Sequence, residues 1–277
     1  MLAREQPSLC FFPCLGPISP FLFFNELINQ DTNRNRPFFL ENIMAYPEVK
    51  TVEEFKQQPE EYQTAVKKIV RSHSINELYG ARVFDEPAIA FAPTPYAKWL
   101  TCRVAMEEYH HHVRFKKLAD EIGIPESETV PNPSKKPLSI FEYPLKTWEE
   151  FCTIKLVADY AEILQVEDLL HCSFHPLRNI ARLTMPEEKF HAQFGKDFCT
   201  EIIQAPGGKE KVQEALNHYF PYLPAFFGGD KSKNNEMFRQ YGLKQRSNEE
   251  MRADYIERVG ALVGSLGLTL PEVRLAA

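Results

Sequence analysis

Four long stretches with helical periodicity limit what this chain can fold into. Apolar residues recur at three- and four-residue spacing over about 60–85, 94–122, 146–172 and 175–204. Each stretch exceeds the ~11–12 residues of an average helix, and runs of alternating β-branched residues are almost absent. The sequence therefore predicts an all-α domain, built as an up-and-down helical bundle.

Shorter helical patterns lie at about 51–58, 208–219 and 247–265, so the bundle is expected to carry extra C-terminal helices. Clusters of proline and glycine mark the boundaries between helices. They fall at Asp85-Glu86-Pro87, across 123–144, at 205–208 and at 228–230. We expect a helix to end at each of these four places.

The first 43 residues differ in character from the rest of the chain. They hold seven of the 21 phenylalanines, and their apolar stretch, Leu9 to Phe24, is interrupted by three prolines. That stretch is shorter than the ~20 residues of a membrane-spanning helix, and no small-residue cleavage site closes it cleanly. We interpret residues 1–43 as a disordered extension or the product of an upstream start, and 44–277 as a single domain.

Composition argues against several classes of partner. The chain has 32 Lys+Arg and 38 Asp+Glu, a net charge of -6 and no basic block, so neither a nucleic-acid partner nor a membrane is expected. The six cysteines form no CxxC pair or regular framework, which is typical of reduced thiols in a cytoplasmic protein. Because no dinucleotide loop or P-loop is present, electrons for any redox reaction are expected from another protein.

Two Glu-x-x-His pairs carry the chemical signal. This spacing places a carboxylate and an imidazole on one helix face, so each pair can give a metal two ligands. Near residue 109 two registers are available, Glu107 with His110 or Glu108 with His111. The stripe through Glu108 and His111 is otherwise apolar, whereas the stripe through Glu107 and His110 is charged and is expected to face water. We therefore predict that Glu108 and His111 point inward.

The second pair is Glu188 with His191, and two more acids lie on apolar faces. Glu77 precedes Glu108 by 31 residues and Asp159 precedes Glu188 by 29, so each half of the domain has one carboxylate followed by one Glu-x-x-His. A di-iron carboxylate bundle has this order, and unpaired buried acids would be costly. We predict six metal ligands: Glu77, Glu108, His111, Asp159, Glu188 and His191. The four carboxylates among them are also expected to be catalytic.

The remaining polar residues near these pairs are given other roles. Glu107 or Tyr109 is expected to orient neighbouring groups without touching metal. Six histidines are interpreted as surface, core or supporting residues rather than ligands: His73, His110, His112, His171, His175 and His218.

Several stretches of the chain resemble the phenylacetate-catabolism oxygenases. The resemblance covers roughly 50–272 and is carried by 73–123, by Ser139-Ile140-Phe141-Glu142-Tyr143-Pro144 followed by Trp148 and Asp159, and by 187–191, 219–221, 227–230 and 266–271. Within the family the chain is most similar to the catalytic A subunits of ring-epoxidising enzymes. The resemblance implies a ferritin-like di-iron monooxygenase, and the family's six ligands fall on the six positions named above.

The resemblance also implies an activity and partners. Such enzymes insert one oxygen atom of O2 into the aromatic ring of an aryl-CoA thioester such as phenylacetyl-CoA. They work with a flavin/iron–sulfur reductase, which supplies electrons, and with a related non-catalytic helical subunit. Two iron ions are implied, although carboxylates and imidazoles also suit manganese. The alternatives are a ferritin-like metal-binding or iron-storage protein and a non-catalytic scaffold subunit.

Four positions depart from the family pattern. Tyr109 and His110 stand where small residues are expected, and Glu162 is an extra acid one turn after Asp159. Pro186 is expected to interrupt the helix just before the second Glu-x-x-His, because proline removes a hydrogen bond from the helix interior. None of these four residues replaces a predicted ligand.

Overall fold

The computed structural model describes residues 46–132, 134 and 139–273. The proposed extension, 1–43, lies outside the described residues. Within them no strand is formed, and a single isolated bridge joins Val49 to Phe174. No helix in this part of the chain is both long enough and apolar enough to cross a membrane. The prediction of an all-α fold is confirmed.

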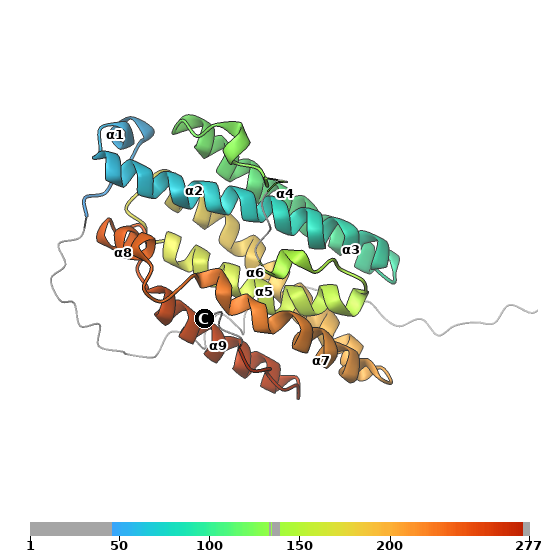
Figure 1. The fold of residues 1–277 in the computed structure, drawn as a ribbon. Coiled ribbons are helices and arrows are strands. Elements are labelled where there is room, and N and C mark those ends of the chain that lie inside the picture. Colours follow the sequence, from blue (N-terminus) through green and yellow to red (C-terminus); the bar gives the residue numbers. More distant parts are fainter. Residues whose placement is uncertain (1–45, 133, 135–138, 274–277) are drawn as a thin grey trace, which may run out of the picture. The chain divides into compact units, whose positions relative to one another are not determined.

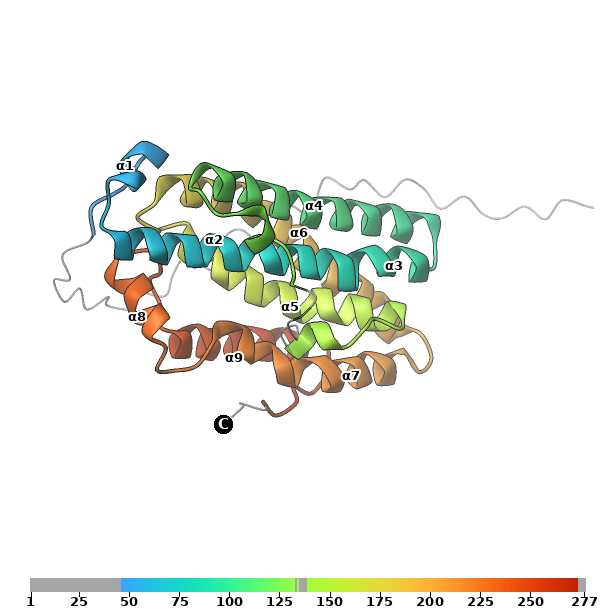
Figure 2. The same cartoon turned by 45° about the horizontal axis from the view of Figure 1, so that its top comes forward.

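Figures 1 and 2 show the arrangement of the helices. Their bounds are α1 Val52–Lys56, α2 Glu60–Gly80, a π-helical turn Ala81–Asp85, α3 Glu86–Phe91, α4 Pro95–Glu121, α5 Trp148–Leu169, α6 His175–Gln204, α7 Gly208–Tyr219, α8 Lys233–Gln240 and α9 Asn248–Ser265. Short 3-10 segments lie at Glu126–Glu128, Ser139–Glu142 and Phe220–Phe227.

Four long helices form the bundle. α2 packs along α4 and α5 packs along α6, and the α5–α6 contact is the most extensive in the domain. The segment between α4 and α5 connects the two pairs, as in ferritin-like bundles. α7 and α9 lie against α5 on the side away from α2 and α4, which Figures 1 and 2 both show. These are the extra C-terminal helices that the sequence predicts.

Side-chain caps explain why several helices begin where they do. Thr94 accepts a hydrogen bond from the Ala97 amide at the start of α4, where Pro95 is the first helical residue. α5 begins with a reciprocal capping box in which Thr147 and Glu150 each accept a hydrogen bond from the other's amide. These caps fix the ends of two helices that carry predicted ligands.

The predicted helix end at Asp85-Glu86-Pro87 is wrong. The backbone continues from α2 through the π-helical turn into α3, and the Glu86 amide bonds to the Ala81 carbonyl, five residues back. Because the π turn already shifts the hydrogen-bond register here, Pro87 is tolerated near the start of α3. π turns of this kind are frequent at functional sites.

The expectation at Pro186 also needs correction, and one helix was not predicted. α6 runs without a break from His175 to Gln204, so Pro186 does not interrupt it. The proline ring is exposed, so the carbonyl that loses its partner can be solvated. α8 was not predicted, because this helix has eight residues and few apolar positions, although Ser232 caps it by accepting from the Asn235 amide.

The closest approach of α5 and α6 is set by Gly195. A Cβ atom at this position would lie 2.3 Å from the Leu156 nitrogen and 2.5 Å from the Lys155 carbonyl carbon. Gly195 stands one turn after His191 on α6. The absence of its side chain therefore sets the separation of these helices beside the predicted ligands.

Candidate metal centre

The six predicted ligands come from all four helices of the bundle. α2 provides Glu77, α4 provides Glu108 and His111, α5 provides Asp159, and α6 provides Glu188 and His191. None of these residues is more than 6% exposed. Such burial is unusual for acids, which are rarely enclosed unless they are paired or bind a metal.

One group of ligand atoms gathers around His111. The carboxylates of Glu77, Glu108 and Glu188 each place an oxygen so that these atoms and a His111 nitrogen all lie within 4.8 Å of one another. From His111 Nδ1 the distance is 3.1 Å to Glu188 Oε1, 3.5 Å to Glu77 Oε2 and 3.7 Å to Glu108 Oε2. Three carboxylates and one imidazole therefore surround one position.

A second group faces His191. Its Nδ1 lies 3.1 Å from Glu108 Oε1 and 3.9 Å from Glu188 Oε2. Glu108 and Glu188 thus offer one oxygen to each imidazole. Asp159, the remaining predicted ligand, is buried on this side but lies outside the compact group around His111.

Each imidazole is oriented by a carboxylate from the opposite Glu-Glu-x-x-His segment. His111 Nε2 lies 2.8 Å from Glu187 Oε2, and His191 Nε2 lies 2.9 Å from Glu107 Oε2. Such outer partners fix the ring, and they turn Nδ1 of both histidines toward the centre. Glu107 is only 8% exposed, so the prediction that its stripe faces water is wrong for this residue.

Two arginines hold these outer carboxylates. Arg114 donates to both oxygens of Glu187, and Arg103 donates to Glu107 at 2.9 Å. The Arg103 guanidinium also lies 3.8 Å above the centre of the Phe190 ring. The imidazoles are thus positioned by chains of interactions that reach the surface of the bundle.

The carboxylates also control the protonation of the imidazoles. Burial opposes charge on His111, but the neighbouring carboxylates of Glu108, Glu187 and Glu188 outweigh burial and raise the pKa of His111 far above its ordinary value. The pKa of His191 is raised to about 10, again because carboxylate neighbours outweigh burial. Without metal, these protons offset part of the buried negative charge, and a metal that binds Nδ1 must displace them.

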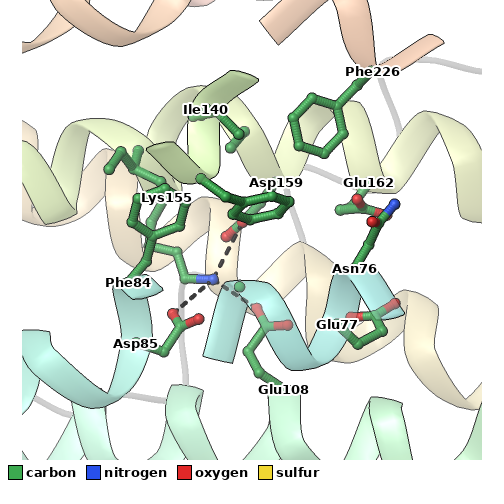
Figure 3. Close-up of a pocket in the computed structure, with 14 residues that line it drawn as sticks. Asn76, Glu77, Phe84, Asp85, Glu108, Ile140, Lys155, Asp159, Glu162 and Phe226 are labelled. Carbon is green, nitrogen blue, oxygen red and sulfur yellow. Dashed lines mark hydrogen bonds and ion pairs between the residues drawn. The ribbon is translucent and has the colours of Figure 1, made fainter. Parts of the chain in front are cut away.

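Lys155 lies beside the ligands and was missed from the sequence. Its Nζ is 2.6 Å from Glu108 Oε1, 3.3 Å from Asp159 Oδ1 and 3.0 Å from Asp85 Oδ1 (Figure 3). Lys155 is 3% exposed and stands one turn before Asp159 on α5. The sequence offered one indication of its role, because Lys155 stands in a helix whose other buried positions are mostly apolar. Asp85 belongs to the π turn, and the predicted helix end there concealed its inward direction.

A cavity of about 50 Å³ adjoins the carboxylates. Glu77, Glu108, Lys155 and Asp159 line its polar side together with the extra acid Glu162. Figure 3 shows aromatic and aliphatic side chains across from the carboxylates. The apolar residues that line the cavity include Phe84, Ile140, Phe141, Ile154 and Phe226.

Neighbouring residues of the tandem histidines point elsewhere. His110 is exposed and accepts a hydrogen bond from Arg114, and His112 is buried and donates to the Ser74 carbonyl. The Tyr109 hydroxyl donates to Glu86 at 2.6 Å and does not line the cavity. The expectation that Glu107 or Tyr109 orients a ligand therefore applies to Glu107.

The donor set around His111 fits a divalent metal. Four buried ligand atoms surround one position, and oxygen and imidazole donors suit iron or manganese. The buried Nδ1 atoms of both histidines and both oxygens of Glu188 make no hydrogen bond within the described part of the protein. Unsatisfied buried polar atoms are rare unless they have a ligand. On the His191 side, Lys155 already lies against two of the acids.

Comparison with known proteins identifies the family of the chain. Residues 44–276 match the family model described as "Phenylacetic acid catabolic protein". The chain belongs to this family. It is also 24% identical over 220 residues to the A subunit of 1,2-phenylacetyl-CoA epoxidase from Escherichia coli (strain K12), an alignment that covers 77% of this chain and 71% of that protein. The family resemblance inferred from the sequence is thus confirmed, and the family supports a role in phenylacetate catabolism.

Proposed function

We propose that this protein is the catalytic subunit of a di-iron monooxygenase that inserts one oxygen atom into the ring of an aryl-CoA thioester such as phenylacetyl-CoA. The convergence of Glu77, Glu108, His111 and Glu188 on one buried position carries the proposal, because a subunit without catalysis has no need for such a group. The proposed ligand set also includes Asp159 and His191. The similarity to the A subunit of an epoxidase supports the same assignment.

The chain's own residues would supply the metal ligands and hold them in position. When bound, an iron pair supplies activation of dioxygen, with two electrons from a separate donor. With those two electrons and two protons, one oxygen atom would enter the ring and the other would leave as water. Glu107 and Glu187 hold the two imidazoles in place, and the apolar wall of Phe84, Phe141 and Phe226 offers an aromatic ring a surface next to the carboxylates.

Partners and location belong to the same proposal. The relative is by name one subunit of an enzyme, which supports assembly with a related helical subunit, and the chemistry requires electrons from a reductase. The described cysteines Cys102, Cys152, Cys172 and Cys199 are free, which supports work in the cytoplasm.

The experiment compares two adjacent histidines after anaerobic loading with iron. His111→Ala removes a buried imidazole from the centre, whereas His110→Ala removes an exposed ring from the same helix. We expect the first variant to lose bound iron and phenylacetyl-CoA-dependent O2 consumption in the presence of an electron donor. The second should retain both, and it serves as the matched control.

Other outcomes separate the alternatives. Uptake of many irons per chain, without O2 consumption that depends on the thioester, would identify an iron-storage protein. Metal binding without turnover, even with every partner protein present, would identify a non-catalytic scaffold subunit. Equal loss in both variants would contradict the assignment of the inward register.

A further inference from the structure

The centre is asymmetric, and Lys155 causes the asymmetry. Around His111, the surrounding ligand atoms belong to Glu77, Glu108 and Glu188. Among the described residues, Lys155 forms its ion pairs with Asp85, Glu108 and Asp159 and none with Glu77 or Glu188. On the His191 side, the lysine ammonium contacts one oxygen of Glu108 and one of Asp159. The two halves of the centre therefore differ in how accessible their carboxylates are to a metal.

The contacts of Lys155 compete directly with metal binding on the His191 side. A metal there would use Glu108 Oε1 and the Asp159 carboxylate, and metal–oxygen bonds of about 2.0–2.2 Å would place it close to the ammonium. Two cations a few ångströms apart repel each other strongly when water is excluded. The ammonium therefore has to leave both carboxylates before a second metal can bind them.

Asp85 gives the displaced ammonium a partner. It lies 3.0 Å from Lys155 Nζ, is 1% exposed and does not belong to the ligand group around His111. Figure 3 shows it on the side of the ammonium opposite Asp159, with the cavity beside them. Lys155 can thus give up Glu108 and Asp159 while it keeps one buried ion pair.

We propose that Lys155 holds the place of the second metal, so that the two metal positions load in sequence and with unequal affinity. The first metal binds tightly among Glu77, Glu108, His111 and Glu188. The second binds only when Lys155 withdraws to Asp85. This inference rests on the metal centre of the proposed function, but it does not depend on the identity of the substrate.

The test is equilibrium dialysis of the full chain against Fe²⁺ without oxygen, with the metal content per chain as the readout. In the wild-type protein we expect the first iron to bind at least tenfold more tightly than the second. Lys155→Met keeps the length of the side chain but removes its charge. This variant should bind the second iron at least tenfold more tightly than the wild-type protein does, and its affinity for the first iron should change less than threefold.

Two further variants sharpen the test. Asp85→Asn removes the partner of the displaced ammonium, so it should weaken the second iron, the opposite of Lys155→Met. Lys244→Met is the matched control, since Lys244 donates to Gln165 rather than to a ligand, and it should leave both affinities unchanged. Lys155→Gln serves in place of Lys155→Met if that variant does not fold, with the same expected result.

Equal affinities for the two irons in the wild-type protein, or an unchanged second affinity in both Lys155 variants, would overturn the inference and leave the metal centre standing. Failure of wild type and variants alike to bind any iron would overturn the metal centre too. The two proposals can therefore fail separately.

Discussion

Replacement of Gly195 by alanine tests how the α5–α6 contact supports the centre. The added Cβ would lie 2.3 Å from the Leu156 nitrogen, a backbone atom that cannot rotate away. The helices would have to separate by roughly 1 Å to restore ordinary van der Waals contact. Overpacking of this kind costs about 1–3 kcal/mol, and the better helix propensity of alanine returns about 0.5–1 kcal/mol.

We expect the free energy of unfolding to fall by about 2 kcal/mol, the upper part of the range that these two effects give, because the clash involves backbone atoms. For a domain of this size that corresponds to a melting temperature lower by about 4–8 °C. Thermal unfolding followed by circular dichroism measures it. Iron affinity should fall in the same variant, because α5 would carry Asp159 away from Glu188.

Gly264→Ala is the matched control. Gly264 lies in α9, and apart from its chain neighbours and the adjacent backbone of α9 no described atom comes within 4 Å of the point where its Cβ would lie. Alanine should therefore be neutral or stabilising by about 0.5–1 kcal/mol. A Gly195→Ala protein that melts at or above the wild-type temperature would refute the reasoning about close helix contact.

Two further predictions concern the start of the second Glu-x-x-His segment. Pro186→Ala restores a helix amide at an exposed position, so the melting temperature should rise by a few degrees; a fall would show that α6 needs the proline to dock. Burial opposes the charge of Glu187, but His111 and Arg114 outweigh it and lower its pKa to about 2 from 4.5. The contribution of Glu187 to stability is therefore present above pH 4.5 and is lost as the pH falls toward 2. In Glu187→Gln, the free energy of unfolding measured with urea should depend less on pH over that interval. An unchanged pH dependence would contradict this.

The sequence predicts the bundle well because its helices are long. Stripes such as Val104, Glu108, His111 and Phe115 repeat over enough turns to fix which face is inside, and all four residues are buried. Short elements lack such repetition, which is why α8 was missed. The continuation through Asp85 was missed for another reason, because proline normally marks a helix end and the π turn removes that constraint.

The supporting residues of the centre were harder to predict than the candidate ligands. Glu107 stands in a charged stripe, and only the approach of α6 buries it beside His191. Lys155 of α5 contacts Glu108 of α4, and residue spacing along a single helix cannot predict a contact between two helices. Periodicity describes single helices, whereas these contacts depend on how separate helices dock.

The exchange of carboxylates between the two Glu-Glu-x-x-His segments has a consequence for assembly. Glu187 of α6 orients His111 of α4, and Glu107 of α4 orients His191 of α6. Neither helix pair, α2 with α4 or α5 with α6, contains the carboxylate that orients its own imidazole. A half-folded or mispaired chain would therefore have disordered ligands and would bind metal poorly. If the proposed metal binds, its uptake would act as a check on correct folding, because only a domain with both helix pairs in register would gain the added stability of the bound ion.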